Sequence, residues 1–154
     1  MWATRLRRIM EAMLLTGSPQ IDAERAFARE VRARRRASVA RRLRRLPAAC
    51  ARLAVYDERS RARSGRRGVR EIPLDAIAGT VEPSRATLFD GAFRPRGTAR
   101  ARWQRLWLAE QRGAVLPPIS VVRVGDEYAI RDGHHRVSVA RARGALTIDA
   151  AVEA

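Results

Sequence analysis

The spacing of apolar positions along the chain changes near residue 69. Before that point apolar residues recur every three or four positions, which is typical of amphipathic helices. This spacing predicts one helix over residues 2–14. A second helix is predicted to begin at Ser18, as N-cap, with Pro19 at its first position, and to end before Pro47.

The segment that follows is predicted to continue as a helix and then to become a linker. A third helix is predicted from Pro47 to about Ser60, with Leu53 on its apolar side. Glycine, serine and arginine dominate from Arg59 to Gly68, which favours a flexible basic linker. Residues 1–68 are therefore predicted to be a basic helical arm with its linker, and residues 69–154 a domain that folds without it.

The second part has the short, alternating segments of a mixed fold. The predicted order is a strand from Val69, a helical turn after Pro73, a long irregular loop over residues 80–97, a helix from its N-cap Thr98 to Gly113, a strand from Ile119, a turn at Gly125 and Asp126, a strand through Tyr128 and Ile130, a helix from His134 to Gly144, and a strand from Thr147 to Val152. We interpret this as an α+β domain whose mixed sheet contains a strand hairpin feeding directly into a helix. Trp103 and Trp107 lie at helical spacing, which favours core packing over a base-stacking platform.

Charge is distributed unevenly between the two parts. All 32 basic residues are arginine and the net charge is +16. Residues 1–70 hold 20 arginines against 6 acidic residues, and residues 71–154 hold 12 against 10. Such an excess favours a polyanionic partner, which is nucleic acid or an acidic membrane surface.

The arm is therefore predicted to bind nucleic acid without sequence preference, through its phosphate backbone. The predicted contacts share one basic stretch and are Arg34, Arg35, Arg36, Arg41, Arg42, Arg44 and Arg45. A solvated arm that packs weakly on the domain, with its charge inflated by arginine-rich coding, remains an equal alternative.

Other features narrow the class of protein. A single cysteine, Cys50, excludes an intramolecular disulfide and a cysteine-based zinc site. No window has the roughly 18 apolar residues of a spanning helix, and Glu11 interrupts the only segment that resembles a signal peptide. We expect a cytoplasmic protein.

The candidate chemistry lies in the segment RDGHHR, residues 131–136, where a strand meets a helix. The first turn of a helix has free N–H groups and partial positive charge, and Gly133 lets the backbone approach an anion closely. His134, His135 and Arg136 add donors, the last in a forked geometry. Asp132 is expected to cap this turn or to hold a magnesium ion that accompanies phosphates.

Three other interpretations of the histidines stay open. Zinc needs three or four ligands, and the adjacent pair His134 and His135 does not supply them, so we expect no metal held by the protein alone. General-base catalysis needs a nucleophile and an orienting group, which the sequence does not identify. The histidines could also simply cap and pack the helix.

The segment from Leu116 to Val152, preceded by EIPLDAIAG, resembles the ParB/sulfiredoxin superfamily. The shared features are a PI-x-V strand, a hairpin ending in a Gly-x-x-Arg box, a helix and a closing strand. The resemblance covers about residues 69–153. It implies that the box, Gly133 to Arg136, lies on the phosphates of a nucleoside triphosphate, CTP or ATP, with Mg²⁺. It also suggests Arg85, Arg94 and Arg96, from the preceding loop, as further phosphate contacts.

The chain also departs from the family. Sulfiredoxin has a reactive cysteine inside the box, where His134 and His135 stand here, so peroxiredoxin repair is not expected. The resemblance favours a nucleotide-binding domain with a role in DNA partitioning or regulation. There are two alternatives: a small phosphotransferase or nucleotide hydrolase that uses the box with Mg²⁺, and a DNA-associated regulator without nucleotide binding. Homodimerisation stays open.

The histidines also predict a pH dependence. Because phosphate favours the charged imidazole, phosphate binding is expected to tighten below about pH 6.5.

Overall fold

The computed structural model describes residues 17–57 and 68–153. Its elements are, in chain order, α2 (Pro19–Leu43), η1 (Ala48–Ala51), β1 (Ala54–Val55), β2 (Gly68–Pro73), η3 (Leu74–Ala76), β3 (Ile77–Thr80), η4 (Pro83–Arg85), η5 (Gly97–Ala99), α3 (Arg100–Gln111), β4 (Ile119–Val124), β5 (Glu127–Asp132), α4 (His134–Ala142) and β6 (Thr147–Glu153). The helix predicted over residues 2–14 and nearly all of the predicted linker lie outside the described residues. No helix within the described ranges is long and apolar enough to cross a membrane.

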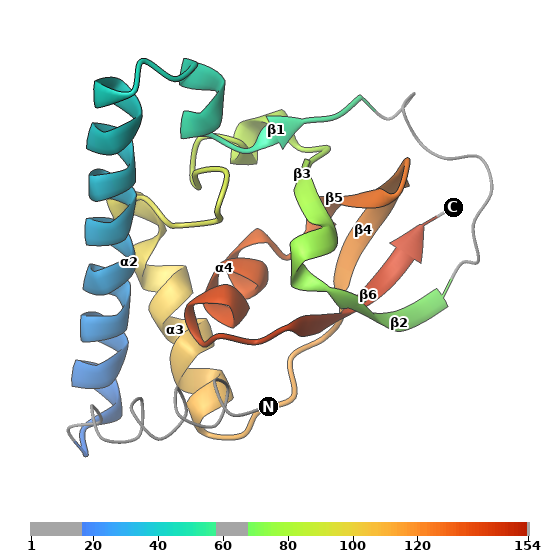
Figure 1. The fold of residues 1–154 in the computed structure, drawn as a ribbon. Coiled ribbons are helices and arrows are strands. Elements are labelled where there is room, and N and C mark those ends of the chain that lie inside the picture. The colour runs from blue at the N-terminus through green and yellow to red at the C-terminus, as the bar shows by residue number, and fades with distance from the viewer. Residues whose placement is uncertain (1–16, 58–67, 154) are drawn as a thin grey trace.

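The strands form one mixed sheet in the order β1-β3-β5-β4-β6-β2. The pairs β1–β3, β3–β5 and β4–β6 are parallel, whereas β4–β5 and β2–β6 are antiparallel. The hairpin turn predicted at Gly125 and Asp126 is confirmed, because Val124 pairs with Glu127 across it. The predicted α+β fold, with a hairpin that leads into a helix, is also confirmed (Figure 1).

Helix α4 packs on one face of the sheet and forms the first core. Val137 and Ala140, three residues apart on one side of the helix, lie against Ile119, Val121 and Ile130. Ile148 of β6 is only partly buried, at the border of this cluster. This packing fixes the direction of α4 relative to the strand that precedes it.

Helices α2, α3 and α4 form a second core. Helix α3 packs between α2 and α4, on the side of α4 that faces away from the sheet (Figure 1). The Phe27 ring meets the edge of Trp103 at 5.4 Å between centroids, and Trp103 stacks on Trp107 at 5.3 Å. The indole Nε1 of Trp103 donates to Ser138 Oγ at 2.9 Å. The two tryptophans are therefore core residues, as predicted, and not a base-stacking platform.

The prediction of a third helix from Pro47 is wrong. The described part of that segment forms the short η1 turn and then β1, where Leu53 is fully buried and its N–H donates to Ala86 O. The segment lies in the sheet because β3 offers a parallel partner, with Ala54 opposite Gly79. A Cβ at Gly79 would lie 2.2 Å from Ala54 O, so glycine permits this approach. Long-range pairing thus overrides the helical pattern.

Two boundaries differ from the sequence prediction. Helix α2 ends at Leu43, before the predicted end, and Arg45 adopts φ 51° in the turn that follows. Thr98 is not an N-cap; it lies in η5, and Ala99 precedes the first residue of α3. The predicted stop at Gly113 is confirmed by its φ of 80°.

Candidate functional site

The site begins at Gly133, between β5 and α4. Gly133 has φ 108° and ψ 17°, a conformation that side chains disfavour. A Cβ there would lie 2.4 Å from Ile119 Cγ2 and 3.2 Å from an Arg136 nitrogen. The glycine therefore lets the chain turn sharply into α4. The first-turn N–H groups of α4 have no acceptor within the helix, and the helix dipole makes this end partly positive.

A pocket of about 290 Å³ opens at this helix start. Its lining consists of three arginines, two histidines, one carboxylate and three neighbours without charge, which are Arg85, Arg102, Arg136, His134, His135, Asp132, Gly133, Leu106 and Pro117. We call it the anion pocket. Cationic side chains outnumber the carboxylate three to one, so its field favours a negatively charged ligand.

His134 lies at the buried base of α4 and is held by the sheet. Its Nε2 lies 2.7 Å from Thr80 Oγ1, and its ring is nearly parallel to that of Phe89. Burial, assisted by Arg85, lowers the pKa of His134 to about 4. The imidazole is therefore neutral at pH 7 and anchors α4 to β3.

His135 is buried as well, but it is held differently. It meets the Phe89 ring edge-on at 5.2 Å, and no described residue hydrogen-bonds its imidazole. Burial, with Arg102 and Arg85 as further causes, lowers its pKa to about 4. An unbonded, neutral imidazole thus lines the anion pocket, where it can donate one hydrogen bond to a ligand.

These pKa values correct the expected pH dependence. In the protein without ligand both imidazoles are already neutral at pH 6.5, so the pKa of an ordinary histidine no longer sets the pH at which the affinity changes. A bound phosphate still favours the charged imidazole, and tighter binding at lower pH stays a prediction. The change is now expected between the free pKa near 4 and whatever higher value the ligand imposes.

Stability is expected to fall as the pH is lowered from 7 towards 4. Unfolding returns each histidine to a pKa near 6.5, so the unfolded chain binds more protons in this window and is favoured by acid. The expected cost is on the order of 2 kcal/mol per histidine at pH 5. Urea unfolding at pH 7, 6 and 5 tests this with His135→Leu, which removes a titrating group and no hydrogen bond to a described residue. An equally steep pH dependence in His135→Leu would contradict it.

Arg136 has a structural role in this conformation. Its side chain is only 11 % exposed. It donates to the carbonyl oxygens of Pro117 and Pro118, the latter at 2.9 Å, and to Asp132 Oδ2 at 2.6 Å. The guanidinium fork that was predicted to grip phosphate therefore holds the loop before β4. Arg136 lines the anion pocket, but three of its five N–H donors already have acceptors.

Asp132 does not cap α4. The helix has no side-chain cap, and the Asp132 carboxylate extends instead to Arg136, where it is 66 % exposed. Within the described residues no three His, Cys, Asp or Glu side chains are grouped as metal ligands. Asp132 is the one carboxylate that lines the anion pocket, so any Mg²⁺ here would depend on ligand phosphates for most of its coordination.

Arg85 and Arg102 supply the available positive charge. Arg85 ends η4 and Arg102 lies in the first turn of α3, and both are exposed. Neither guanidinium group donates a hydrogen bond to, or forms an ion pair with, any described residue. Each also contributes to the lowered pKa of His135, which places their charge near the imidazole. The sequence did not identify Arg102 as a site residue. The available signal was its position in the first turn of α3, next to the core residue Trp103.

The other loop arginines lie elsewhere. Arg94 donates to Ala33 O at 3.2 Å and lies 3.7 Å from Asp90, facing α2. The charge of Arg96 acts on Arg34, whose pKa is lowered mainly by burial. Neither Arg94 nor Arg96 lines the anion pocket, so the structure groups Arg85 alone of the three with the box.

The arginines predicted to bind nucleic acid divide into two groups. Arg34 points inward and donates to Leu88 O and Arg94 O, both at 3.1 Å. Arg41 is half-buried and donates to Ser38. The exposed members are Arg35, Arg36, Arg42, Arg44 and Arg45. Arg34 is therefore unavailable to a polyanion in this conformation, and Arg41 is less accessible than the exposed members.

Comparison with known proteins adds a likeness of fold. No protein-family model matches the chain, and no curated protein matches it. Among solved structures, the chain is similar to the crystal structure of sulfiredoxin from Arabidopsis thaliana. The identity is 22 %, the TM-score is 0.42, and the match covers 56 % of this chain and 84 % of that one. The similarity concerns the fold alone.

Proposed function

We propose that the chain binds the phosphate groups of a nucleotide in the anion pocket. The observation that supports this most directly is the position of Arg85 and Arg102, two exposed guanidinium groups from separate elements that line the start of α4. Backbone N–H groups at a helix start and free guanidinium groups are the donors that phosphate oxygens accept best.

The size of the pocket supports a phosphate ligand more than a fully enclosed nucleotide. Its volume of about 290 Å³ lies at the lower end of the usual range of roughly 300–1,000 Å³ for ligand sites. A di- or triphosphate would fill it, and the sugar and base would extend outside. CTP and ATP, with Mg²⁺ on the phosphates, are the candidates that the family resemblance favours.

Catalysis is the second candidate function, and His135 is the observation that favours it. A neutral imidazole in a phosphate site can accept a proton from an attacking water or hydroxyl, as a phosphotransferase or hydrolase requires. However, a pKa of about 4 makes His135 a weak base at neutral pH. We therefore favour binding over hydrolysis, and a role in DNA partitioning or regulation stays a prediction.

Removing the charges of Arg85 and Arg102 is expected to weaken phosphate binding. Arg85→Gln combined with Arg102→Gln removes two charge-assisted contacts, each of about 1.5–3 kcal/mol before discounting for solvent. We expect about a hundredfold loss of affinity for pyrophosphate, ATP and CTP. Calorimetry with and without Mg²⁺ measures it, and release of inorganic phosphate from the same samples tests for hydrolysis.

The matched control replaces Arg105 and Arg112, two exposed arginines of the α3 region that do not line the pocket. This control loses the same net charge and should bind as the wild type does. Equal weakening by both double variants would indicate a general charge effect. Absence of binding below about millimolar concentration in the wild type would favour the regulator without nucleotide binding.

A further inference from the structure

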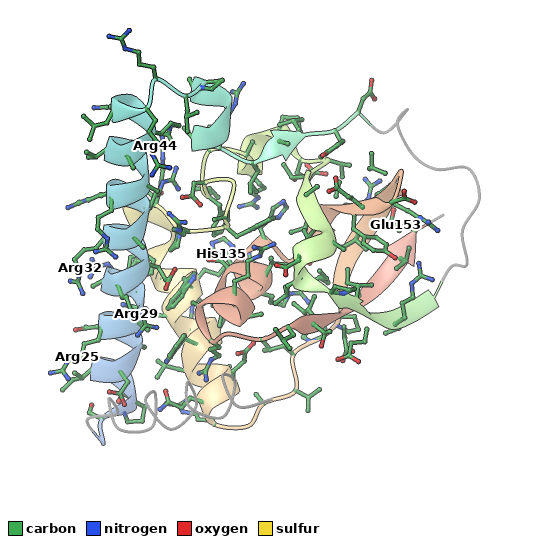
Figure 2. The ribbon with its side chains drawn as sticks, in the orientation of Figure 1. Arg25, Arg29, Arg32, Arg44, His135 and Glu153 are labelled. Atoms are coloured by element: carbon green, nitrogen blue, oxygen red, sulfur yellow. The ribbon has the colours of Figure 1, made fainter. Side chains whose placement is uncertain are left out.

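The outer face of α2 carries a row of arginines that the anion pocket does not use. Arg25, Arg29, Arg32 and Arg36 are spaced by four, three and four residues, which places them on one side of the helix. All four are exposed, whereas Ala23, Ala26 and Phe27 are buried against α3 on the other side. Figure 2 shows Arg25 and Arg32 extending from α2 on the side away from the sheet.

The row is almost free of compensating negative charge. Arg29 lies 3.7 Å from Glu30, and no described acidic side chain pairs with Arg25, Arg32 or Arg36. Exposed Arg35 and Arg42 flank the row. Arginine side chains held this close together repel one another, so a polyanion that brings phosphates to the row relieves the repulsion.

The fold holds this row rigidly. Arg34, on the inner side of α2, donates to the carbonyl groups of Leu88 and Arg94, which ties the helix to the loop before α3. Phe27 is fully buried against Trp103. Arg25 and Arg36 are therefore separated by a fixed rise of about 16 Å along the helix axis, so the charges are positioned before any ligand arrives.

We propose that this face of α2 binds double-stranded nucleic acid through its phosphate backbone, independently of the anion pocket. A helix about 10–12 Å across fits a groove or lies along a strand of phosphates. The outer face offers arginine, alanine and aliphatic side chains, and α2 contains no asparagine and one glutamine, Gln20, in its first turn. The side chains that usually pair with adenine edges are thus almost absent, and the arginines can contact any phosphate of the backbone, so we expect little sequence preference.

An acidic membrane is the competing polyanion, and the packing of α2 disfavours it. A helix that lies in a membrane surface inserts an apolar face. Phe27, the largest apolar residue of α2, is buried in the protein. Ile21, Val39 and Leu43 are exposed, but they lie before Arg25 or after Arg36, at the two ends of α2, and form no continuous apolar face along the arginine row. We therefore commit to nucleic acid and treat vesicle binding as an outcome of the test.

The test compares two quadruple variants of the full chain. One carries Arg25→Gln, Arg29→Gln, Arg32→Gln and Arg36→Gln. The other removes four exposed arginines outside α2, by Arg52→Gln, Arg96→Gln, Arg105→Gln and Arg112→Gln. Both lose four positive charges, and glutamine keeps the helix propensity of arginine. Circular dichroism confirms that each variant is folded.

Fluorescence anisotropy with two labelled duplexes of unrelated sequence, at several salt concentrations, provides the readout. The wild type should bind both duplexes equally. In the α2 variant the negative slope of log affinity against log salt should decrease in magnitude by about 3 to 4. The affinity at about 0.1 M salt should fall at least a hundredfold. The variant outside α2 should change much less.

Three results would overturn the proposal. The α2 variant could bind duplexes as the wild type does. The wild type could prefer one duplex by more than about tenfold, which would require base contacts. Finally, vesicles with anionic lipid could bind the wild type but not the α2 variant, while neither protein binds the duplexes. That result would assign this face of α2 to a membrane.

Discussion

A chain reduced to residues 69–154 is expected to lose its cooperative folding. The deletion removes Phe27 and Leu53, which are buried in different core clusters, together with β1. Truncating a buried phenylalanine or leucine typically costs about 3–5 and 2–5 kcal/mol. The combined loss approaches the total stability of many domains, about 5–15 kcal/mol. The arm that the sequence predicted as a separate unit is, on this argument, needed for folding.

Urea unfolding followed by tryptophan fluorescence measures this loss, because Trp103 is covered by α2. Phe27→Ala in the full chain is the graded comparison, with an expected loss of about 3–5 kcal/mol. The truncated chain should be less stable than that variant. A truncated chain that unfolds cooperatively, with a stability within about 1 kcal/mol of the full chain, would contradict the expectation and support an independent domain.

Gly133→Val is expected to destabilise the fold by at least about 3 kcal/mol. A branched side chain must adopt φ 108°, and its Cβ would lie 2.4 Å from Ile119 Cγ2, a buried atom of β4. Gly97→Val is the matched control, because a Cβ there meets nothing within 4 Å and no positive φ strains the backbone. Urea unfolding of the two variants should therefore differ strongly.

Similar stability in both glycine variants would contradict this account of the β5–α4 junction. The result also bears on phosphate binding. If Gly133→Val is unstable, its loss of affinity cannot be attributed to backbone approach alone. Arg136→Ala has the same drawback, because Arg136 holds the carbonyl groups of Pro117 and Pro118. Replacing Arg85 and Arg102 is the cleaner test of the anion pocket, because neither guanidinium group holds another part of the fold.

The hairpin and the helix that follows it were predictable because their determinants are local. Gly125 and Asp126 fix the turn, and Gly133 fixes the entry into α4. The period of Val137 and Ala140 then identifies the core side of α4. These signals depend on neighbours within a few residues, so no tertiary information was needed.

The strands β1 and β3 were not predictable in the same way. Each is short, and each becomes a strand through a parallel partner that is distant in the sequence. The same holds for the site. Arg102 joins the anion pocket only because α3 packs beside α4, and the donors of Arg136 are engaged only because the loop at Pro117 lies against them. Tertiary contacts decide which arginines remain free.

The most direct test of the central claim is a titration of the ¹⁵N-labelled full chain with pyrophosphate, followed by NMR. Binding in the anion pocket predicts saturable shifts of the amide signals of residues 133–136 and of the guanidinium signals of Arg85 and Arg102. The Arg25–Arg36 row of α2 should respond less, because it lacks the helix-start N–H groups. Shifts confined to that row, or none at the pocket up to about 10 mM pyrophosphate, would contradict the claim.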